Sequence, residues 1–165
     1  MSTPLRSSLL TFALTALLVL LSAAPAWAMV DESQRGPDVT HPKPSKAQQA
    51  VDRALDVVGT PYRWGGSSPS TGFDCSGLIR WAYGGVGIDL PHSSYALYDQ
   101  GRRVPTSSMK PGDLLFFEGL GHVGMYMGGG RMVHSPQTGR SVEVVRLSAT
   151  NYGARLIGAR RVIAS

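Results

Sequence analysis

Apolar residues are most concentrated near the amino terminus. One positive charge, Arg6, precedes an apolar run from residue 9 to residue 21, and Ala26-Trp27-Ala28 has the small-x-small pattern of a signal-peptidase site. The run is too short for a comfortable membrane span, and no cysteine stands directly after it to carry a lipid. We therefore expect residues 1–28 to be the signal peptide of a secreted protein without stable membrane insertion. An uncleaved anchor is the alternative.

The next segment changes from a polar pattern to an amphipathic one. Residues 29–45 are polar and contain several prolines, which is typical of a flexible linker. Ser45 is a favourable N-cap for a helix over residues 46–58, in which apolar residues recur on one side until Gly59. The pattern predicts that a folded domain begins at residue 46 and extends to residue 165.

A second helical pattern follows the extended stretch around residues 60–66. Asp74 is a favourable N-cap, and a set of apolar residues then falls on one side of the helix: Leu78, Ile79, Trp81 and Ala82. A small helix is expected from about Ser93 to Gln100. We expect Trp64, in the extended stretch, to be an ordinary core aromatic residue.

Short apolar runs replace the helical pattern in the second half of the chain. They predict strands at residues 113–117, 122–127, 131–134, 142–145 and 156–162, separated by glycine, aspartate and serine. Helices followed by strands of this kind indicate an α+β fold, with the N-terminal helices packed on a C-terminal antiparallel sheet of about five to six strands. Nothing in this pattern requires more than a monomer.

The chain is basic, with a net charge of +5 and a pI near 9.7. This charge favours attraction to polyanions, which for an exported protein are anionic wall polymers or a membrane surface. The basic residues are scattered and are not interleaved with aromatic residues as in single-strand nucleic-acid binders. We therefore expect no nucleic-acid partner.

Cys75 is the only cysteine of the chain. Cysteines of exported proteins usually form disulfides, so a single one indicates either intermolecular pairing or a thiol kept for its reactivity. In the first turn of a helix, the free N–H groups and the helix dipole favour the thiolate and can also hold an oxyanion. The alternative is a small buried residue at the start of a core helix.

Two histidines flank the predicted hairpin at Gly128-Gly129-Gly130. With a three-residue loop, Met127 faces Arg131 and Gly124 faces His134, so His122, Gly124 and His134 share one face of the sheet. The imidazoles of His122 and His134 are then close enough to form a hydrogen bond, as two members of a triad do. A two-residue or four-residue loop would move His134 to the other face.

Two other interpretations of these residues remain open. Cys75, His122 and His134 have the ligand types of a zinc site, although the gap between the histidines differs from common zinc motifs. The histidines could also be two separate surface residues. His92 has no predicted partner and is expected in a loop or groove.

Five blocks of the sequence resemble, in order, the signatures of the NlpC-like family of bacterial cell-wall cysteine peptidases. They are Tyr62-Arg63-Trp64-Gly65-Gly66, Phe73-Asp74-Cys75-Ser76-Gly77-Leu78, Pro111-Gly112-Asp113-Leu114-Leu115-Phe116-Phe117, Gly121-His122-Val123-Gly124-Met125-Tyr126 and Met132-Val133-His134-Ser135. The resemblance implies a papain-like fold and hydrolysis of peptidoglycan stem peptides at the cell wall, commonly at the bond between D-γ-glutamate and a diamino acid. It implies no cofactor and no metal.

The same resemblance implies roles for individual residues. Cys75 corresponds to the nucleophile, His122 to the general base and His134 to the residue that orients the base. Tyr62 matches a tyrosine proposed to help bind substrate or the oxyanion. Two further residues, Asp74 and Ser76, match positions that contact the free amine of an N-terminal L-alanine in some members, although Asp74 is equally explained as a helix cap.

Other functions fit parts of the same pattern. The thiol chemistry also suits an amidase that cuts between muramic acid and L-alanine, or a toxin directed at the walls of competing bacteria. A non-catalytic wall-binding protein would use the basic surface alone, and the complete set of Cys75, His122 and His134 argues against that class.

Overall fold

The computed structural model describes residues 43–163. The predicted signal peptide (1–28) and nearly all of the predicted linker (29–45) lie outside the described residues. Within residues 43–163, no helix combines the length and apolar character needed to cross a membrane.

Three helices precede the main sheet: α1 (Lys46–Asp56), α2 (Cys75–Gly84) and α3 (Ser94–Tyr98). The first two begin at the predicted caps, Ser45 and Asp74, and α3 begins one residue after the predicted start at Ser93. The Ser45 hydroxyl accepts a hydrogen bond from the Gln48 amide, and the Asp74 carboxylate accepts one from the Gly77 amide. The caps satisfy amide groups that a helix start leaves free, so these two serine and aspartate positions define where the helices begin.

The main sheet has six antiparallel strands in the order β3-β8-β4-β5-β6-β7. Their bounds are β3 (Arg102–Val104), β4 (Leu114–Phe117), β5 (Val123–Gly128), β6 (Arg131–His134), β7 (Glu143–Arg146) and β8 (Leu156–Arg161). All five predicted strands are present, and the α+β prediction is confirmed. The sequence did not reveal β3 or the two-stranded hairpin of β1 (Ser67–Ser68) and β2 (Gly72–Phe73), because these strands are too short for an alternating pattern.

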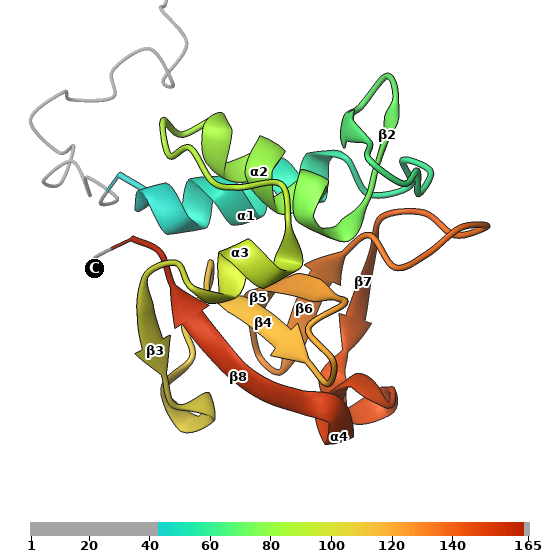
Figure 1. Cartoon of the computed structure of the whole chain (residues 1–165). Helices are drawn as coiled ribbons and strands as arrows, with labels where there is room; N and C mark the ends of the chain where they lie inside the picture. The colour runs from blue at the N-terminus through green and yellow to red at the C-terminus, as the bar shows by residue number, and fades with distance from the viewer. Residues whose placement is uncertain (1–42, 164–165) are drawn as a thin grey trace, which may run out of the picture. The chain divides into compact units, whose positions relative to one another are not determined.

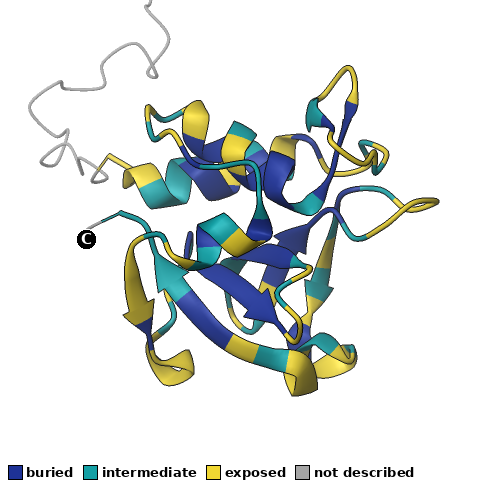
Figure 2. Cartoon of the chain, in the orientation of Figure 1, coloured by how far each residue is buried: buried dark blue, intermediate teal, exposed yellow. Residues whose placement is uncertain are grey.

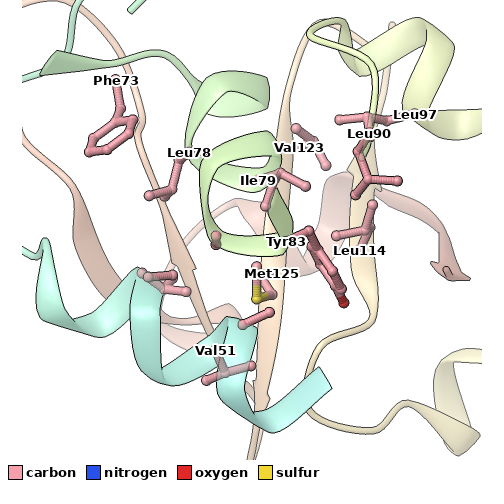
Figure 3. Close-up of a cluster of buried hydrophobic side chains, with 14 of the residues drawn as sticks. Val51, Phe73, Leu78, Ile79, Tyr83, Leu90, Leu97, Leu114, Val123 and Met125 are labelled. Carbon is pink, nitrogen blue, oxygen red and sulfur yellow. The ribbon is translucent and has the colours of Figure 1, made fainter. Parts of the chain in front are cut away.

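The helices pack on one face of the sheet and enclose the larger hydrophobic core (Figure 1). Side chains from α1, α2, α3, β4 and β5 meet there, as Figure 3 shows for Val51, Ile79, Leu97, Leu114 and Met125. Burying such side chains is the main favourable contribution to folding. The position of α2, and therefore of Cys75 at its first residue, is set by this core.

A smaller core lies on the other face of the sheet. It joins Leu115, Phe117 and Met132 to Leu147 and Ala159. The remaining elements of the chain are two short 3-10 helices, Thr106–Ser108 and Leu147–Ala149, and the helix α4 (Tyr152–Arg155). Strand β4 is buried along its whole length (Figure 2), which explains why its sequence is continuously apolar and does not alternate.

The hairpin between β5 and β6 differs from the prediction at its tip. The loop between the paired residues Gly128 and Arg131 has two residues, Gly129 and Gly130, both with positive φ. The predicted pairing of Met127 with Arg131 is therefore wrong. The register shifts between Tyr126 and Gly128, and this bulge adds one residue to β5. The bulge compensates for the shorter loop and restores the predicted register from Tyr126 onward.

Candidate active site

Cys75 is the first residue of α2 and is partly buried. Burial raises the pKa of the Cys75 thiol, and the amide N–H groups of Val123, Ser76 and Cys75 itself lower it; the Asp74 carboxylate adds to the increase. The sequence predicted that the helix N–H groups would favour the thiolate. They act in that direction, but removal of the sulfur from water outweighs them, so the resting thiol is neutral.

His122 and His134 form a hydrogen-bonded pair. Nε2 of His122 lies 2.9 Å from Nδ1 of His134. His122 directly precedes β5, whereas His134 ends β6 and is fully buried, so the interpretation as two separate surface histidines is wrong. Gly124 makes room for the pair, since a Cβ there would lie 2.7 Å from Sδ of Met132 and 3.4 Å from Cβ of His134.

Both imidazoles are neutral near pH 7. Burial, the neighbouring His134 and the Arg155 guanidinium together lower the pKa of His122 to about 3, and burial has the largest effect. Burial and the Arg140 guanidinium lower the pKa of His134 to about 4. Within residues 43–163, no group of three or more histidine, cysteine, aspartate or glutamate side chains has the arrangement of a metal site, so the zinc interpretation of Cys75 and the two histidines lacks a ligand cluster.

Aromatic rings form the wall behind the histidine pair. The ring of Tyr152 stacks on His122 with centroids 5.4 Å apart, and it meets His134 edge to face at 4.9 Å. Phe117 packs on His122 as well, with centroids 5.7 Å apart. These contacts exclude water from the two imidazoles and account for their low pKa values. The sequence did not identify Tyr152, because it lies between the predicted strands 142–145 and 156–162, where no element was predicted.

The start of α2 and the hairpin meet at two points. The Val123 amide, directly after His122, is directed at the Cys75 sulfur. The Ser135 hydroxyl, directly after His134, donates a 2.7 Å hydrogen bond to the carbonyl of Phe73. The thiol and the histidine pair, far apart in the sequence, are therefore neighbours in the structure.

Asp74 is 7% exposed, and its carboxylate accepts four hydrogen bonds. Its Oδ1 accepts hydrogen bonds from the Gly77 amide at 2.7 Å, from Nε2 of His92 at 2.9 Å and from the Ser76 hydroxyl at 3.2 Å. Its Oδ2 accepts one from the Gly65 amide at 2.8 Å. Asp74 therefore caps α2, and it also holds His92, which had no predicted partner, beside the thiol.

A cleft opens beside Cys75. It is lined by Trp64, Asp74, Cys75, Ser76, His92, Ser93, Ser94, Tyr95 and Gly121. The expectation that Trp64 is a core residue is wrong, since its side chain is 85% exposed at the edge of this cleft. Tyr95 is exposed there too. The cleft thus combines a thiol, a carboxylate and two exposed aromatic rings, which suits a ligand with both polar and apolar parts.

Tyr62 is half-buried near the thiol. Burial raises the pKa of its phenol, and the negative charges that Cys75 and Asp74 carry when ionised add to the increase. The hydroxyl therefore stays protonated at neutral pH and is able to donate a hydrogen bond. The Tyr62 amide donates a 2.8 Å hydrogen bond to the carbonyl of Arg140, which ties this segment to the loop before β7.

Comparison with known proteins adds a family to this geometry. A model of the NlpC/P60 family matches residues 59–161. The murein DD-endopeptidase MepH of Escherichia coli is 42% identical over 122 residues, which is 69% of this chain and 45% of that protein. The gamma-D-glutamyl-L-lysine dipeptidyl-peptidase of Bacillus subtilis is 42% identical over 121 residues, which is 70% of this chain and 40% of that protein. The chain spans less than half the length of these two relatives.

Solved structures agree with the sequence comparison. A protein of this family from Bacillus cereus has a TM-score of 0.68 and 38% identity, covering 74% of this chain and 42% of that chain. The NlpC/p60 domain of the peptidoglycan hydrolase SagA has a TM-score of 0.63 and 37% identity, covering 70% of this chain and 97% of that domain. The predicted papain-like fold is thereby confirmed. Since the family model covers well over half of the chain, including Cys75, His122 and His134, this protein belongs to the NlpC/P60 family.

Proposed function

We propose that this protein is a cysteine endopeptidase that hydrolyses peptidoglycan stem peptides. The observation that carries the proposal is the placement of the Cys75 thiol, at the first residue of a helix, beside the hydrogen-bonded pair of His122 and His134. A thiol, an imidazole base and a group that orients the base are the parts needed for acyl transfer through a thioester. The aromatic wall behind the histidines supports the same chemistry by excluding water.

In the proposed mechanism, His122 is the general base. Its Nε2 is occupied by His134, which leaves Nδ1 for the thiol. The S–H bond of Cys75 breaks as its proton moves to Nδ1, and the sulfur attacks the amide carbonyl carbon. Because the thiol and the imidazole both rest in neutral forms, the proton moves during the attack and not before substrate binds.

The remaining steps use hydrogen-bond donors near the thiol. The Cys75 amide and the protonated Tyr62 hydroxyl would stabilise the oxyanion. The imidazolium of His122 then gives its proton to the leaving amine, and the peptide C–N bond breaks. Water, deprotonated by His122, hydrolyses the thioester and restores the thiol.

The proposed bond is the one between D-γ-glutamate and the following diamino acid. Its support is the relative named as a gamma-D-glutamyl-L-lysine dipeptidyl-peptidase, which shares 42% identity with this chain. MepH, equally similar, is named for a DD bond, so cleavage of a DD cross-link is the second candidate. An amidase cut before L-alanine would give a third set of fragments.

Digestion of purified peptidoglycan and soluble stem peptides tests this function, with products identified by mass and Cys75→Ala as the control. Fragments that end in D-glutamate, formed only with the intact thiol, are the expected result. Conversion of cross-linked dimers to monomers with intact stem peptides, without fragments that end in D-glutamate, would move the bond to the cross-link. Free lactyl groups would indicate the amidase. Equal digestion by Cys75→Ala would overturn the thiol mechanism.

We further propose that Asp74 and Ser76 contact the free amine of an N-terminal L-alanine. Both line the cleft next to the thiol, and a carboxylate is a natural partner of an ammonium group. The wild-type protein should then cleave a stem peptide with a free amine faster than its N-acetylated form. Equal kcat/KM values for the two peptides would contradict this contact.

The site of action follows from the substrate. We propose that residues 1–28 direct export, that residues 29–45 link the leader to the domain and that the protein acts as a monomer in the cell wall. The net charge of +5 favours contact with anionic wall polymers. Amino-terminal sequencing of the secreted protein, with a new terminus at residue 29 expected, tests the export proposal.

A further inference from the structure

A carboxylate stands behind the histidine pair. Glu143 on β7 lies directly across from His134 on β6, in the antiparallel pairing of these strands. Nε2 of His134 lies 3.3 Å from Oε1 of Glu143. Both atoms are buried and have no hydrogen-bond partner among the described residues, and their own 3.3 Å approach is a polar contact that falls short of an aligned hydrogen bond. Among the described residues, Oε1 of Glu143 is therefore the only polar partner of Nε2 of His134, and the reverse also holds.

This contact determines where the protons of both imidazoles lie. A neutral imidazole has one N–H and one lone pair, and an ionised carboxylate only accepts hydrogen bonds. The contact with Glu143 therefore requires an N–H at Nε2 of His134 and a lone pair at its Nδ1. Since Nδ1 of His134 is 2.9 Å from Nε2 of His122, the latter must carry the N–H of their shared hydrogen bond. Nδ1 of His122 then keeps its lone pair.

We propose that Glu143 is a positioning residue that fixes the tautomers of His134 and His122, so that Nδ1 of His122 presents the lone pair that accepts the Cys75 proton. The inference rests on the proposed function, in which His122 is the base. Without Glu143, the opposite arrangement becomes available: His134 donates from Nδ1, and His122 carries its proton at Nδ1. An imidazole protonated at that nitrogen cannot take a proton from the thiol.

The surroundings hold Glu143 in one orientation. Its Oε2 accepts a 2.6 Å hydrogen bond from the Arg140 guanidinium, so Oε1 is the oxygen left for His134. The backbone of the same loop is fixed to the start of the domain, because the Arg140 carbonyl accepts from the Tyr62 amide and Ser141 pairs with Pro61. The arrangement therefore runs from Arg140 through Glu143 and His134 to His122.

The isosteric variant Glu143→Gln tests directly whether Glu143 fixes the tautomers. In Glu143→Gln, the single side-chain oxygen faces Arg140, which can only donate, and the NH₂ group faces Nε2 of His134. That NH₂ requires a lone pair at Nε2 and so reverses both tautomers. In the double variant Arg140→Ala with Glu143→Gln, the amide is free to turn its oxygen to His134, which restores the original tautomers.

The test reads the tautomers directly. Two-bond ¹H–¹⁵N spectra of the full chain, labelled at histidine and recorded at pH 7, should show Nδ1 of His122 and of His134 unprotonated in the wild type. Glu143→Ala should lose this pattern, Glu143→Gln should reverse it, and the double variant should recover it. Asp89→Asn, at a nearly fully exposed surface carboxylate, is the control and should leave the spectra unchanged.

Kinetics supply the second readout. We expect kcat to fall about 10-fold to 100-fold in Glu143→Ala and Glu143→Gln with KM little changed, the usual cost of losing an outer partner of a functional histidine. The double variant should recover most of kcat. Wild-type tautomers in Glu143→Ala or Glu143→Gln would overturn the inference, and so would the reversed tautomers in the double variant. A wild-type protein without hydrolytic activity would instead overturn the proposed function, because the spectra judge Glu143 independently and Glu143→Gln preserves side-chain shape.

Discussion

Two carboxylates of the same sheet have very different surroundings. Asp113, just before β4, is 1% exposed and accepts hydrogen bonds from Nε and a terminal nitrogen of Arg161 on β8, each at 2.7 Å, and from the Lys110 amide at 2.8 Å. Glu143, on β7 at the other edge, meets His134 through one 3.3 Å contact between two atoms that have no other partner.

The difference separates a structural contact from a reactive one. A buried charge is costly unless its lone pairs are filled, and at Asp113 they are filled by groups that never change protonation state. At the histidine pair, Nδ1 of His122 must be able to accept and release a proton, so the network cannot be closed in the same way. We infer that the Asp113 pair contributes stability alone, whereas the Glu143 network contributes reactivity.

The largest expected effect is the loss of kcat when a histidine of the pair is removed. In His122→Ala, kcat should fall by about 10² to 10⁴, the usual contribution of a general base. In His134→Ala the fall should be about 10 to 100, because His134 acts only through His122. Steady-state kinetics on a soluble stem peptide measure both, with urea denaturation to show that the fold is retained. Equal losses, or a larger loss in His134→Ala, would contradict these roles.

Loss of the Asp113 carboxylate should lower stability and leave activity nearly unchanged. Asp113→Ala leaves the Arg161 guanidinium, whose side chain is 10% exposed, without its carboxylate, and removing one member of a buried pair costs about 3 to 5 kcal/mol. The free energy of unfolding, measured in urea at pH 7, should fall by about that amount. The activity of the folded variant at 25 °C should stay within about twofold. A large loss of kcat with unchanged stability would erase the distinction between the two carboxylates.

Acid should lower the free energy of unfolding, because His122 and His134 are held neutral in the folded protein. The pKa values of His122 and His134 are lowered in the folded protein to about 3 and about 4, whereas unfolded histidine titrates near 6.5. The unfolded chain therefore binds more protons below pH 6.5, and stability is lost as the pH falls from about 6.5 through about 4. For His134 this amounts to roughly 3 kcal/mol. Urea titrations from pH 7 to pH 4 should show a smaller loss in His134→Asn, and an identical loss would refute this origin.

The smallest expected effect concerns the thiol alone. Because burial raises the pKa of Cys75 above its usual value of 9.0, alkylation by iodoacetamide should increase with pH and reach half its maximum above pH 9. Rapid alkylation with a midpoint below pH 7 would instead indicate a preformed thiolate and imidazolium pair. Mass spectrometry at a series of pH values decides between them, with Cys75→Ala as the blank.

The local elements were readable from the sequence because their determinants are local. Ser45 and Asp74 are polar caps directly before apolar periodicity, and the five predicted strands are short segments rich in apolar residues and separated by turn residues. The approach of His122 to His134 could also be predicted, since strand alternation and hairpin register are short-range rules. Even there, the bulge at Met127 was needed to compensate for a loop shorter than expected.

Contacts between distant segments were decided only by the tertiary structure. Nothing in the sequence pairs Glu143 with His134, because the connection between β6 and β7 is an irregular loop whose length sets no register. The exposure of Trp64, the hydrogen bond between Asp74 and His92 and the packing of Tyr152 on both imidazoles likewise depend on where α2 packs on the sheet.

The resting protonation states divide in the same way. The sequence by itself determined that a cysteine begins a helix and that its N–H groups lower the thiol pKa. Only the packed structure decided that the thiol rests neutral, since the cost of removing a charge from water depends on everything that surrounds it. Capping and alternation act over a few residues, whereas burial is a property of the whole fold.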